Sequence, residues 1–580
     1  MSPSTAPQPP NSRTKLWKFI ERLGQSAWFA YGTIFLLQLH VCWAMWRFRD
    51  LTPGDTSSYF INASHWFYHG VTPILWSPLY TSFYGSLLAI SPDAFTVTIL
   101  HRYLIIFAAS FVILALMRRL FPPDAAWVAT AWWVLQPIDF NTLYEVHLFA
   151  VIPVVLAALL ISKSPSHWNR GAAVATMLVA TLLVRNELLL ATGLLAAAFL
   201  FAGLWGLRRG QATRVNSRIL AAYLVPLTAA GLLTLFYYRH AEDASMLGPS
   251  MERKHTLNIC QTYAFGYQQR YTDFQKSPWT ECRELMTRVY GTPEPSLVEA
   301  LRRNPRAMAE HFLWNVRLIP FGLQVLLLNV SSGTTTPDYV PVTNSRFAWA
   351  GSAILLLIVV TGSLRLRREW RYWWESWLKS RVWSWVLLAA VAVVTCGVMV
   401  TQRPRPSYML SMGVLLRAIV AMLFLVLIAK TPWRKRCTLA YPIVAVLAIL
   451  SVPAYYPLMN PSGQQPLRVA YERLEKFHAA LERPGTNILI SSYGWDLCNY
   501  VTGGICVAAD YANLRSEVSA NNDWLKVLTS HSINAVYVDE AVAADPSGKQ
   551  LVAELSPEWR RLGTGMGAAG EWILFARPGR

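Results

Sequence analysis

Long apolar runs, each close to the length of a bilayer crossing, alternate with short polar segments along most of the chain. An α-helix needs about 20 mainly apolar residues to cross the hydrocarbon core of a bilayer. Runs of near this length lie at about 27–46, 96–117, 125–138, 146–162, 171–184, 187–206, 219–238, 347–364, 382–401, 408–429 and 438–456. The pattern predicts a polytopic α-helical membrane protein with about eleven transmembrane helices, which together make a transmembrane domain over 27–456.

The basic residues between these runs predict the topology, because cytoplasmic loops of membrane proteins carry an excess of Lys and Arg. Basic clusters occur in alternate loops, at 13–22, 118–119, 163–170, 208–218, 365–381 and 430–436. These loops, together with the N-terminal segment 1–26, are predicted to be cytoplasmic. The opposite, outer face receives the loops 47–95 and 239–346, the turns at Asp139 and Arg403, and residues 457–580.

Two further apolar stretches, 74–90 and 312–330, would break this alternation if they were counted as crossings. Arg317 and Pro320 also interrupt the second stretch. Both stretches are therefore predicted to form helices that lie in the outer membrane interface.

The pattern changes after residue 456. Residues 487–492, 535–539 and 572–576 have the β-branched and aromatic content of short strands, whereas 467–482 and 521–530 have helical periodicity. This alternation predicts a small α/β domain over 457–580. Its sequence contains neither a Gly-rich phosphate-binding loop nor a paired-His metal motif.

The composition agrees with a membrane protein. Of the 580 residues 54% are hydrophobic and 15% are charged, against roughly 25% charged residues in soluble domains. The 25 Trp and 25 Tyr residues suit the aromatic belts of a membrane protein. The net charge of +19 does not indicate a nucleic-acid partner, because the Lys and Arg residues lie between apolar runs and not on one polar module. No cleavable signal peptide is expected.

Four of the seven cysteines fall on the predicted outer face, where disulfides persist. Cys260 and Cys282 share the loop 239–346, and Cys498 and Cys506 share the C-terminal domain. Both pairs are candidate disulfides, although spacing alone does not prove them.

Asp55 is the leading candidate for chemistry. It directly follows Gly54, just past the first apolar run, at the membrane edge where a lipid-linked substrate presents its head group. Gly54 allows the backbone to bend and to pass close to a ligand. The alternative is that Asp55 caps the helix that begins near Thr56 to Ser58.

A second outer turn carries Asp139, Glu145 and His147 between two short helices. Ionisable groups at membrane depth are costly and mark function by default, although an acidic turn that only reaches toward the interface is the alternative. These three residue types are able to bind a divalent metal ion, but their spacing matches no recognised metal signature.

Three arginines stand at the outer ends of apolar runs. Arg185 lies two residues before Glu187, either in a structural ion pair or as a ligand-binding group that the glutamate orients. Arg403 and Arg405 precede Tyr408 on a Pro-rich turn before a late helix. Guanidinium groups at a helix start suit phosphate, and contact with lipid head groups is the alternative.

Two weaker candidates complete the predicted outer-face set. Arg102 follows His101 near the outer end of its predicted helix and is grouped with the other arginines. His255 lies in the long outer loop, where it is either a ligand or general base or an ordinary solvated histidine.

The order of these elements resembles that of the GT-C superfamily of integral-membrane glycosyltransferases. The resemblance is to the branch with protein O-mannosyltransferases, the lipid A aminoarabinose transferase and arabinofuranosyltransferases, and it covers the first 240 or so residues best. The shared features are the acid of the first outer loop, the Ser77-Pro78-Leu79-Tyr80 helix, an acidic second turn, an Arg-rich late turn and a C-terminal α/β domain. The first-loop acid of the family, usually Asp or Asp-Glu, maps onto Asp55. The second-turn acid maps onto Asp139, or less directly onto Glu145.

The resemblance implies an inverting enzyme that moves a sugar from a polyprenyl-phosphate donor to a hydroxyl of a glycan, lipid or protein acceptor. It places the reaction at the outer face of a bacterial inner membrane. Asp55 would act as the general base, and Arg403 or Arg405, with Tyr408, would stabilise the leaving phosphate. Trp76 and Tyr80 would stack on a sugar, or else pack in the interface. Such a donor needs no nucleotide, which fits the sequence, and a divalent metal is an optional cofactor.

Three other functions make different demands on the sequence. A transporter or lipid flippase would show repeated Gly- or Pro-broken helices, and the sequence shows no such repeat. A polyprenyl-linked polysaccharide polymerase or ligase would rely on a His- and Arg-rich long loop, and His255 and Arg270 keep that alternative open. A structural assembly protein would not need acids and arginines on the outer face.

Overall fold

A computed structural model describes residues 12–52, 54–137, 145–163, 165–208, 217–241, 249–335, 342–459, 466–477, 488–490, 494–501, 509–510, 514–515, 518, 523–567 and 570–578. Of the residues selected from the sequence, Asp139 and Cys506 lie outside these ranges. The chain divides into two compact units. We call Met1–Trp43 with Leu104–Tyr455 the membrane unit, and Ala44–Tyr103 with Tyr456–Arg580 the loop–domain unit.

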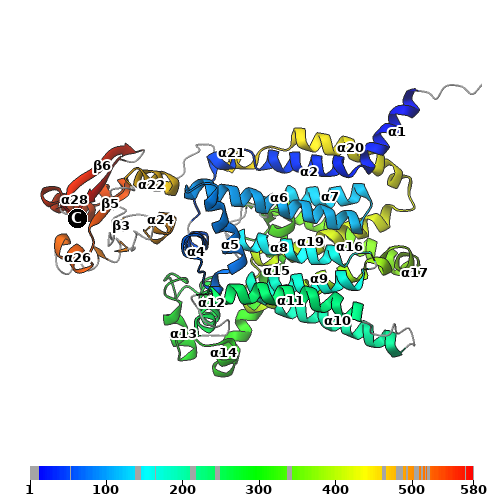
Figure 1. Ribbon diagram of the computed structural model, residues 1–580, viewed down its shortest axis with the longest axis horizontal. Coiled ribbons are helices and arrows are strands. Elements are labelled where there is room, and N and C mark those ends of the chain that lie inside the picture. Colours follow the sequence, from blue (N-terminus) through cyan, green and yellow to red (C-terminus); the bar gives the residue numbers. More distant parts are fainter. Residues whose placement is uncertain are drawn as a thin grey trace, which may run out of the picture. The chain divides into compact units, whose positions relative to one another are not determined.

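The membrane unit is a bundle of helices (Figure 1). Its helices are α1 (Ser12–Gln25), α2 (Ala27–Val41), most of α6 (Ala94–Leu120), α7 (Pro123–Val134), α8 (Glu145–Leu160), α9 (His167–Leu183), α10 (Leu189–Arg208), α11 (Ser217–Arg239), α12 (Pro249–Gln268), α13 (Cys282–Tyr290), α14 (Leu297–Arg303), α15 (Pro305–Leu328), α16 (Ser345–Arg368), α17 (Trp370–Trp373), α18 (Val382–Thr401), α19 (Leu410–Ile428) and α20 (Pro432–Ser451). Shorter elements are η4 (Asn186–Leu188), η5 (Trp374–Leu378), η6 (Lys379–Arg381), η7 (Pro406–Met409) and the parallel pair β1 (Val330–Ser331) and β2 (Val342–Thr343).

Within the part of the chain that the structure describes, nine helices are long and apolar enough to cross a membrane. Eight of them coincide with predicted runs, from Ala27–Phe48 to Pro432–Leu458. The runs at 125–138, 146–162 and 171–184 instead form α7, α8 and α9, with 12, 16 and 17 residues. These helices are shorter than a full crossing usually requires.

The outer faces of several long helices are apolar and open. Only 11% of the most apolar stretch of α11, and the same share of α16, is buried inside the protein. Leu232 and Leu356 are each 63% exposed. A contiguous apolar surface of this extent is not stable in water, so lipid covers it. The chain is a multi-pass membrane protein.

Residues 312–330, which are predicted to lie in the outer membrane interface, belong almost entirely to helix α15. A continuous helix of 24 residues includes Pro320 and is among the nine possible crossings. Its start is capped by Asn304, whose side chain accepts a hydrogen bond from the backbone of Ala307 at 3.1 Å. Asn315 has partners at the end of α18, and Arg317 is exposed with its guanidinium over the Trp314 ring, so neither side chain interrupts the helix. The stretch 74–90 forms only the short helices η1 (Ile74–Trp76), α5 (Pro78–Ser86) and η2 (Leu87–Ala89).

Helices α12 to α14 form a small subdomain with its own apolar core. The predicted disulfide between Cys260 and Cys282 is formed, and it ties the middle of α12 to the first residue of α13. Both cysteines are buried in that core. Cys498 is also disulfide-bonded, and its predicted partner Cys506 lies outside the described residues.

Replacing both Cys260 and Cys282 with Ala is expected to lower the free energy of unfolding of this subdomain by about 3 kcal/mol. This is the loop-entropy value for a bridge that spans 22 residues. Hydrogen exchange of α12 and α13 in the detergent-solubilised protein measures the loss. Cys396→Ser, at an exposed free cysteine, is the control and should leave the exchange unchanged. Equal protection in both variants would contradict the prediction.

The loop–domain unit contains residues 44–103, with the loop predicted to be the first outer one, and the C-terminal α/β domain. Its helices are α3 (Met45–Phe48), α4 (Asp55–His69), α5, the start of α6, most of α21 (Tyr455–Met459), α22 (Pro466–Glu475), α24 (Gly494–Tyr500), α26 (Trp524–Ser530), α27 (Glu540–Ala544) and α28 (Pro546–Glu558). Its strands are β3 (Ile488–Ile490), β4 (Ala509–Asp510), β5 (Ala535–Val538), β6 (Arg560–Gly567) and β7 (Gly570–Ala576), in the order β4-β3-β5-β7-β6.

This sheet confirms the predicted α/β domain and adds to it. The strands β3, β5 and β7 fall where the sequence predicts them, and β3 pairs in parallel with both β4 and β5. The strand β7 pairs antiparallel with β5 and β6. Strand β6 was not predicted, because its sequence RRLGTGMG is rich in glycine, a poor strand former.

An ion pair beside the sheet supports a pH-dependent prediction. Arg473 of α22 donates to Glu540 of α27 at 2.7 Å, and both side chains are less than one-fifth exposed. The hydrogen bond from Arg473 lowers the pKa of Glu540 below its ordinary value of 4.5. The pair therefore stabilises the folded domain above about pH 4.5, and this contribution is lost as the pH falls through the lowered pKa.

Glu540→Gln is expected to destabilise the domain by about 1–2 kcal/mol at pH 7, because Arg473 keeps its charge but loses its ionic partner. The difference from the wild-type protein should shrink as the pH falls below 4.5. Urea unfolding followed by limited proteolysis measures it. Glu472→Gln, which removes an exposed i,i+4 pair with Arg468, should cost about 0.5 kcal/mol or less. A difference that persists unchanged at low pH would contradict the assignment.

Candidate functional site

The Asp55 turn begins the first candidate site, in the loop–domain unit. Gly54 has φ +75°, a backbone conformation that glycine adopts far more readily than other residues. Helix α4 starts at the next residue, Asp55, whose side chain is exposed. No hydrogen bond joins the Asp55 carboxylate to a described residue, so the structure does not support the capping alternative.

The aromatic residues near this turn have different surroundings. Tyr80 is fully buried, and its hydroxyl bonds to Nε2 of His101 at 3.1 Å. Tyr59 packs edge-on against both Tyr80 and Trp76, with ring centroids 5.0 and 5.1 Å away. Tyr80 therefore packs in the core of this unit, whereas Trp76 keeps part of its surface open.

Arg102 holds the loop that leads into the turn. It is 2% exposed, and it donates to the backbone oxygen of Asp50 at 3.3 Å and to the hydroxyl of Thr52. These contacts fix the backbone three to five residues before Asp55. The contacts of Arg102 are thus those of a residue that supports the turn.

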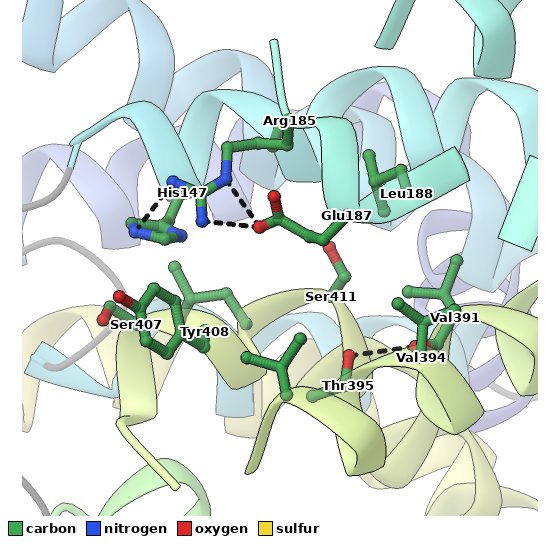
Figure 2. Close-up of a pocket in the computed structure, with 13 residues that line it drawn as sticks. His147, Arg185, Glu187, Leu188, Val391, Val394, Thr395, Ser407, Tyr408 and Ser411 are labelled. Atoms are coloured by element: carbon green, nitrogen blue, oxygen red, sulfur yellow. Dashed lines mark hydrogen bonds and ion pairs between the residues drawn. The ribbon is translucent and has the colours of Figure 1, made fainter. Parts of the chain in front are cut away.

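The membrane unit contains a second candidate site, a polar pocket between helices (Figure 2). The Arg185 guanidinium lies between a carboxylate and an imidazole. Its Nε and Nη2 contact Oε1 of Glu187 at 2.6 and 2.5 Å, and its Nη1 is 3.3 Å from Nε2 of His147. Because a guanidinium only donates, Nε2 of His147 accepts, and the imidazole proton is on Nδ1.

The elements that carry these residues explain the arrangement. Helix α9 ends at Leu183, and Arg185, directly before the turn η4 that leads into α10, lines the pocket. His147 comes from the first turn of α8. The apolar wall comes from α18, and the hydroxyl groups of Ser407 and Tyr408 come from η7.

Tyr408 connects the pocket to a second cation. The guanidinium carbons of Arg185 and Arg405 lie 5.7 and 5.3 Å from the centre of its ring. The His147 ring meets the same ring edge-on at 4.9 Å. Among these side chains and Glu187 there are two guanidinium groups and one carboxylate, a balance that favours an anionic ligand.

Ser407 gives independent support for a polar ligand. Its hydroxyl is buried, lines the pocket, and has no hydrogen-bond partner among the described residues. A buried hydroxyl without a partner is costly. A phosphate or sugar oxygen in the pocket would satisfy it.

The two arginines of the 402–408 turn differ in position. Both are buried, but Arg403 packs on the rings of Phe265 and Trp279, at 4.2 and 5.1 Å from their centres. Arg403 therefore joins this turn to the α12–α14 subdomain, whereas Arg405 faces Tyr408 at the pocket.

Two residues of α15 that were not predicted from the sequence hold this turn in place. Asn315 donates to the backbone oxygens of Val400 and Gln402 at 2.9 and 2.8 Å, at the end of α18. A Cβ atom on Gly322 would stand 2.5 Å from the backbone oxygen of Pro404, so only glycine permits this approach. In the sequence, the only indications of this role were that Asn315 and Gly322 interrupt an apolar run.

His255 and the predicted metal ligands complete the set. His255 is exposed on α12, and its Nε2 lies 3.5 Å from the Asn186 amide of the same turn as Arg185. Glu145 and His147 are both buried in the first turn of α8. Among the described residues no group of three or more His, Cys, Asp or Glu side chains is placed to hold a metal ion, and Asp139 lies outside them.

Comparisons with known proteins give a likeness to solved structures alone. No family model matches the chain, and no curated protein matches it. The chain is similar to the oligosaccharyltransferase of Archaeoglobus fulgidus in the apo form, with 13% identity, 95% of this chain and 75% of that chain covered, and a TM-score of 0.41. It is also similar to ArnT from Cupriavidus metallidurans bound to undecaprenyl phosphate, with 12% identity, 95% and 98% covered, and a TM-score of 0.39. Likeness at this level assigns neither a reaction nor a ligand to this chain.

Proposed function

We propose that this protein is an inverting glycosyltransferase that moves a sugar from a polyprenyl-phosphate donor to an acceptor hydroxyl. The observation that carries the proposal is Asp55, an exposed carboxylate on an ordered helix start of a multi-pass membrane protein. Because the carboxylate makes no hydrogen bond with a described residue, it is available as a general base. A capping hydrogen bond from the Asp55 side chain to α4, which would give the residue a structural role, is absent among the described residues.

The reaction follows from that role. The acceptor oxygen attacks the anomeric carbon, and its proton passes to the Asp55 carboxylate. The bond between the anomeric carbon and the phosphate oxygen breaks, and polyprenyl phosphate leaves with the bonding electron pair. Attack from the face opposite the leaving group inverts the anomeric centre. General-base assistance of this kind contributes typically about 10²–10⁴-fold.

The polar pocket of the membrane unit is proposed to bind the anionic phosphate of the lipid. Arg185 lines it, Arg405 packs against the ring of Tyr408, and Ser407 offers a buried hydroxyl. This shifts the phosphate-binding role, which the sequence assigned to Arg403 or Arg405, toward Arg185. The apolar residues of α18 in the same pocket suit the first carbons of a polyprenyl chain.

The location and the acceptor belong to the same proposal. The alternation of basic loops supports an outer-face reaction at a bacterial inner membrane. The acceptor is a hydroxyl of a glycan, lipid or protein. No step requires a nucleotide, and none is routed through a metal ion.

Transfer from a radiolabelled polyprenyl-phosphate sugar to cell-envelope acceptors, measured with the protein in nanodiscs, tests the function. We expect labelled product and stoichiometric release of polyprenyl phosphate. NMR couplings at the anomeric position of the product should show the configuration opposite to that of the donor. A panel of mannosyl, arabinofuranosyl and aminoarabinosyl donors identifies the sugar. Movement of intact donor across a liposome bilayer without transfer would instead establish a flippase.

A polyprenyl-linked polysaccharide polymerase or ligase is the second candidate. The contact between His255 and the Arg185 turn favours it. Product size separates the two functions, because a polymerase or ligase transfers a chain of several sugars from its lipid and not one residue.

A further inference from the structure

Helix α24 of the C-terminal domain packs against the start of α4. Oδ1 of Asp496 accepts hydrogen bonds from the backbone nitrogen of Gly54 at 2.6 Å and from the hydroxyl of Ser57 at 2.7 Å. Asn499 donates to the same hydroxyl at 3.1 Å, and Tyr500 donates to the backbone oxygen of Thr52 at 2.6 Å. The bonds from α24 thus hold the chain on both sides of Asp55.

A second carboxylate makes the reciprocal contact. Asp50, in the first outer loop, accepts from the backbone nitrogens of Leu467 and Arg468 at 3.0 and 2.8 Å, in the first turn of α22. Burial raises the pKa of Asp50, and these backbone bonds oppose the rise. Asp50 of the loop therefore holds the start of α22, and Asp496 of the domain holds the start of α4.

The turn needs this support. Gly54 is the most conformationally free residue type, and it lies directly before Asp55. Its backbone nitrogen bonds to the side chain of Asp496, and Ser57, which is fully buried, bonds to the same oxygen. Ser57 and Ser58 also bond to the backbone oxygen of Gly54 at 2.9 and 3.2 Å. Without the Asp496 oxygen, the turn keeps these internal bonds but loses its link to α24.

We propose that Asp496 is a positioning residue for Asp55, and that the C-terminal domain thereby forms part of the catalytic machinery. The inference rests on the function proposed above. Displacement of a reacting group by about 1 Å is able to cost about 100-fold in rate. Asp496 acts as a hydrogen-bond acceptor, since its Oδ1 receives both donors.

The substitutions Asp496→Ala and Asp496→Asn test the acceptor role. We expect Asp496→Ala to lower kcat about 10–100-fold with little change in the KM for the donor. Asn keeps an acceptor oxygen, so Asp496→Asn should recover kcat to within about fivefold of wild type. Asp523→Ala is the matched control, because it removes a helix cap of the same domain, on Lys526 of α26, away from α4. It should keep wild-type kcat.

Hydrogen exchange at residues 54–60 gives a readout that does not depend on activity. Asp496→Ala should speed exchange there, and Asp523→Ala should not. If Asp496→Ala does not fold, Ser57→Ala removes the second donor, and we expect a smaller loss of kcat with the same local change in exchange.

The outcomes distinguish this inference from the proposed function. If the wild-type protein transfers no sugar, the proposed function fails. If the wild-type protein transfers sugar and Asp496→Ala retains full kcat, the positioning role is overturned while the function stands. Equal losses in Asp496→Ala and Asp496→Asn would overturn the acceptor role and assign the effect to charge.

Discussion

Asp55→Asn should lower kcat about 10²–10⁴-fold while the protein remains folded and inserted. An amide of nearly the same shape does not accept the proton of the attacking hydroxyl. The substitution has little to disrupt, because the Asp55 side chain is exposed and makes no hydrogen bond with a described residue. The donor KM should change little. Transfer from a labelled polyprenyl-phosphate sugar in nanodiscs gives kcat and KM, and a thermal unfolding curve reports the fold.

Asp93→Asn is the matched control for this measurement. Asp93 lies in the same loop, 47–95, and its carboxylate accepts from the backbone of Thr96 at 2.6 Å, at the start of α6. Because Asn keeps an acceptor oxygen and caps helices about as well as Asp, the substitution should change stability little and leave kcat near wild type. Asp55→Glu should retain part of the rate, because it keeps a base at a displaced position. Full activity in Asp55→Asn would remove the general-base role.

Most of the membrane helices were predictable because the signal is local and strong. Lipid requires about 20 apolar residues in succession, and eight of the nine possible crossings meet that condition in the sequence alone. Helix α15 does not, because Arg317 and Pro320 break the run and Asn315 is polar. Asn315 is satisfied by the end of α18, 85 residues away, and no local pattern contains that contact.

In the candidate site, too, contacts between near neighbours were predictable and long-range contacts were not. The pair of Arg185 and Glu187 was predictable, since the partners are two positions apart. The approach of His147, 38 residues away, was not. The bond from Gly54 to Asp496 joins residues 442 positions apart, so the sequence analysis assigned the C-terminal domain a structure but no chemistry. An ion pair between near neighbours can be predicted from the sequence, whereas the contacts that support the Asp55 turn depend on the tertiary fold.

Arg185→Gln is expected to lower kcat/KM for the donor about 10–100-fold, mainly through a higher KM. A charge-assisted hydrogen bond to phosphate is worth about 1.5–3 kcal/mol, and Gln has neither the charge nor the planar fork of the guanidinium. Arg185→Lys should restore only part of the loss. Binding of polyprenyl phosphate in nanodiscs, at low and high salt, measures the effect directly. Arg283→Gln, which breaks a pair of similar geometry with Glu294 in the α12–α14 subdomain, is the control and should leave binding unchanged.

A double substitution decides between a ligand-binding arginine and a structural ion pair. If Arg185 serves only to neutralise Glu187, then Arg185→Gln combined with Glu187→Gln should recover stability and donor binding together, because no unpaired carboxylate remains. If Arg185 binds the lipid phosphate, the double variant should recover stability but stay about as weak in donor binding as Arg185→Gln alone. Glu187→Gln by itself should then weaken binding less than Arg185→Gln, since it loosens the guanidinium without removing its charge. Recovered binding in the double variant would therefore exclude Arg185 as the phosphate ligand and leave the pocket without its principal cation.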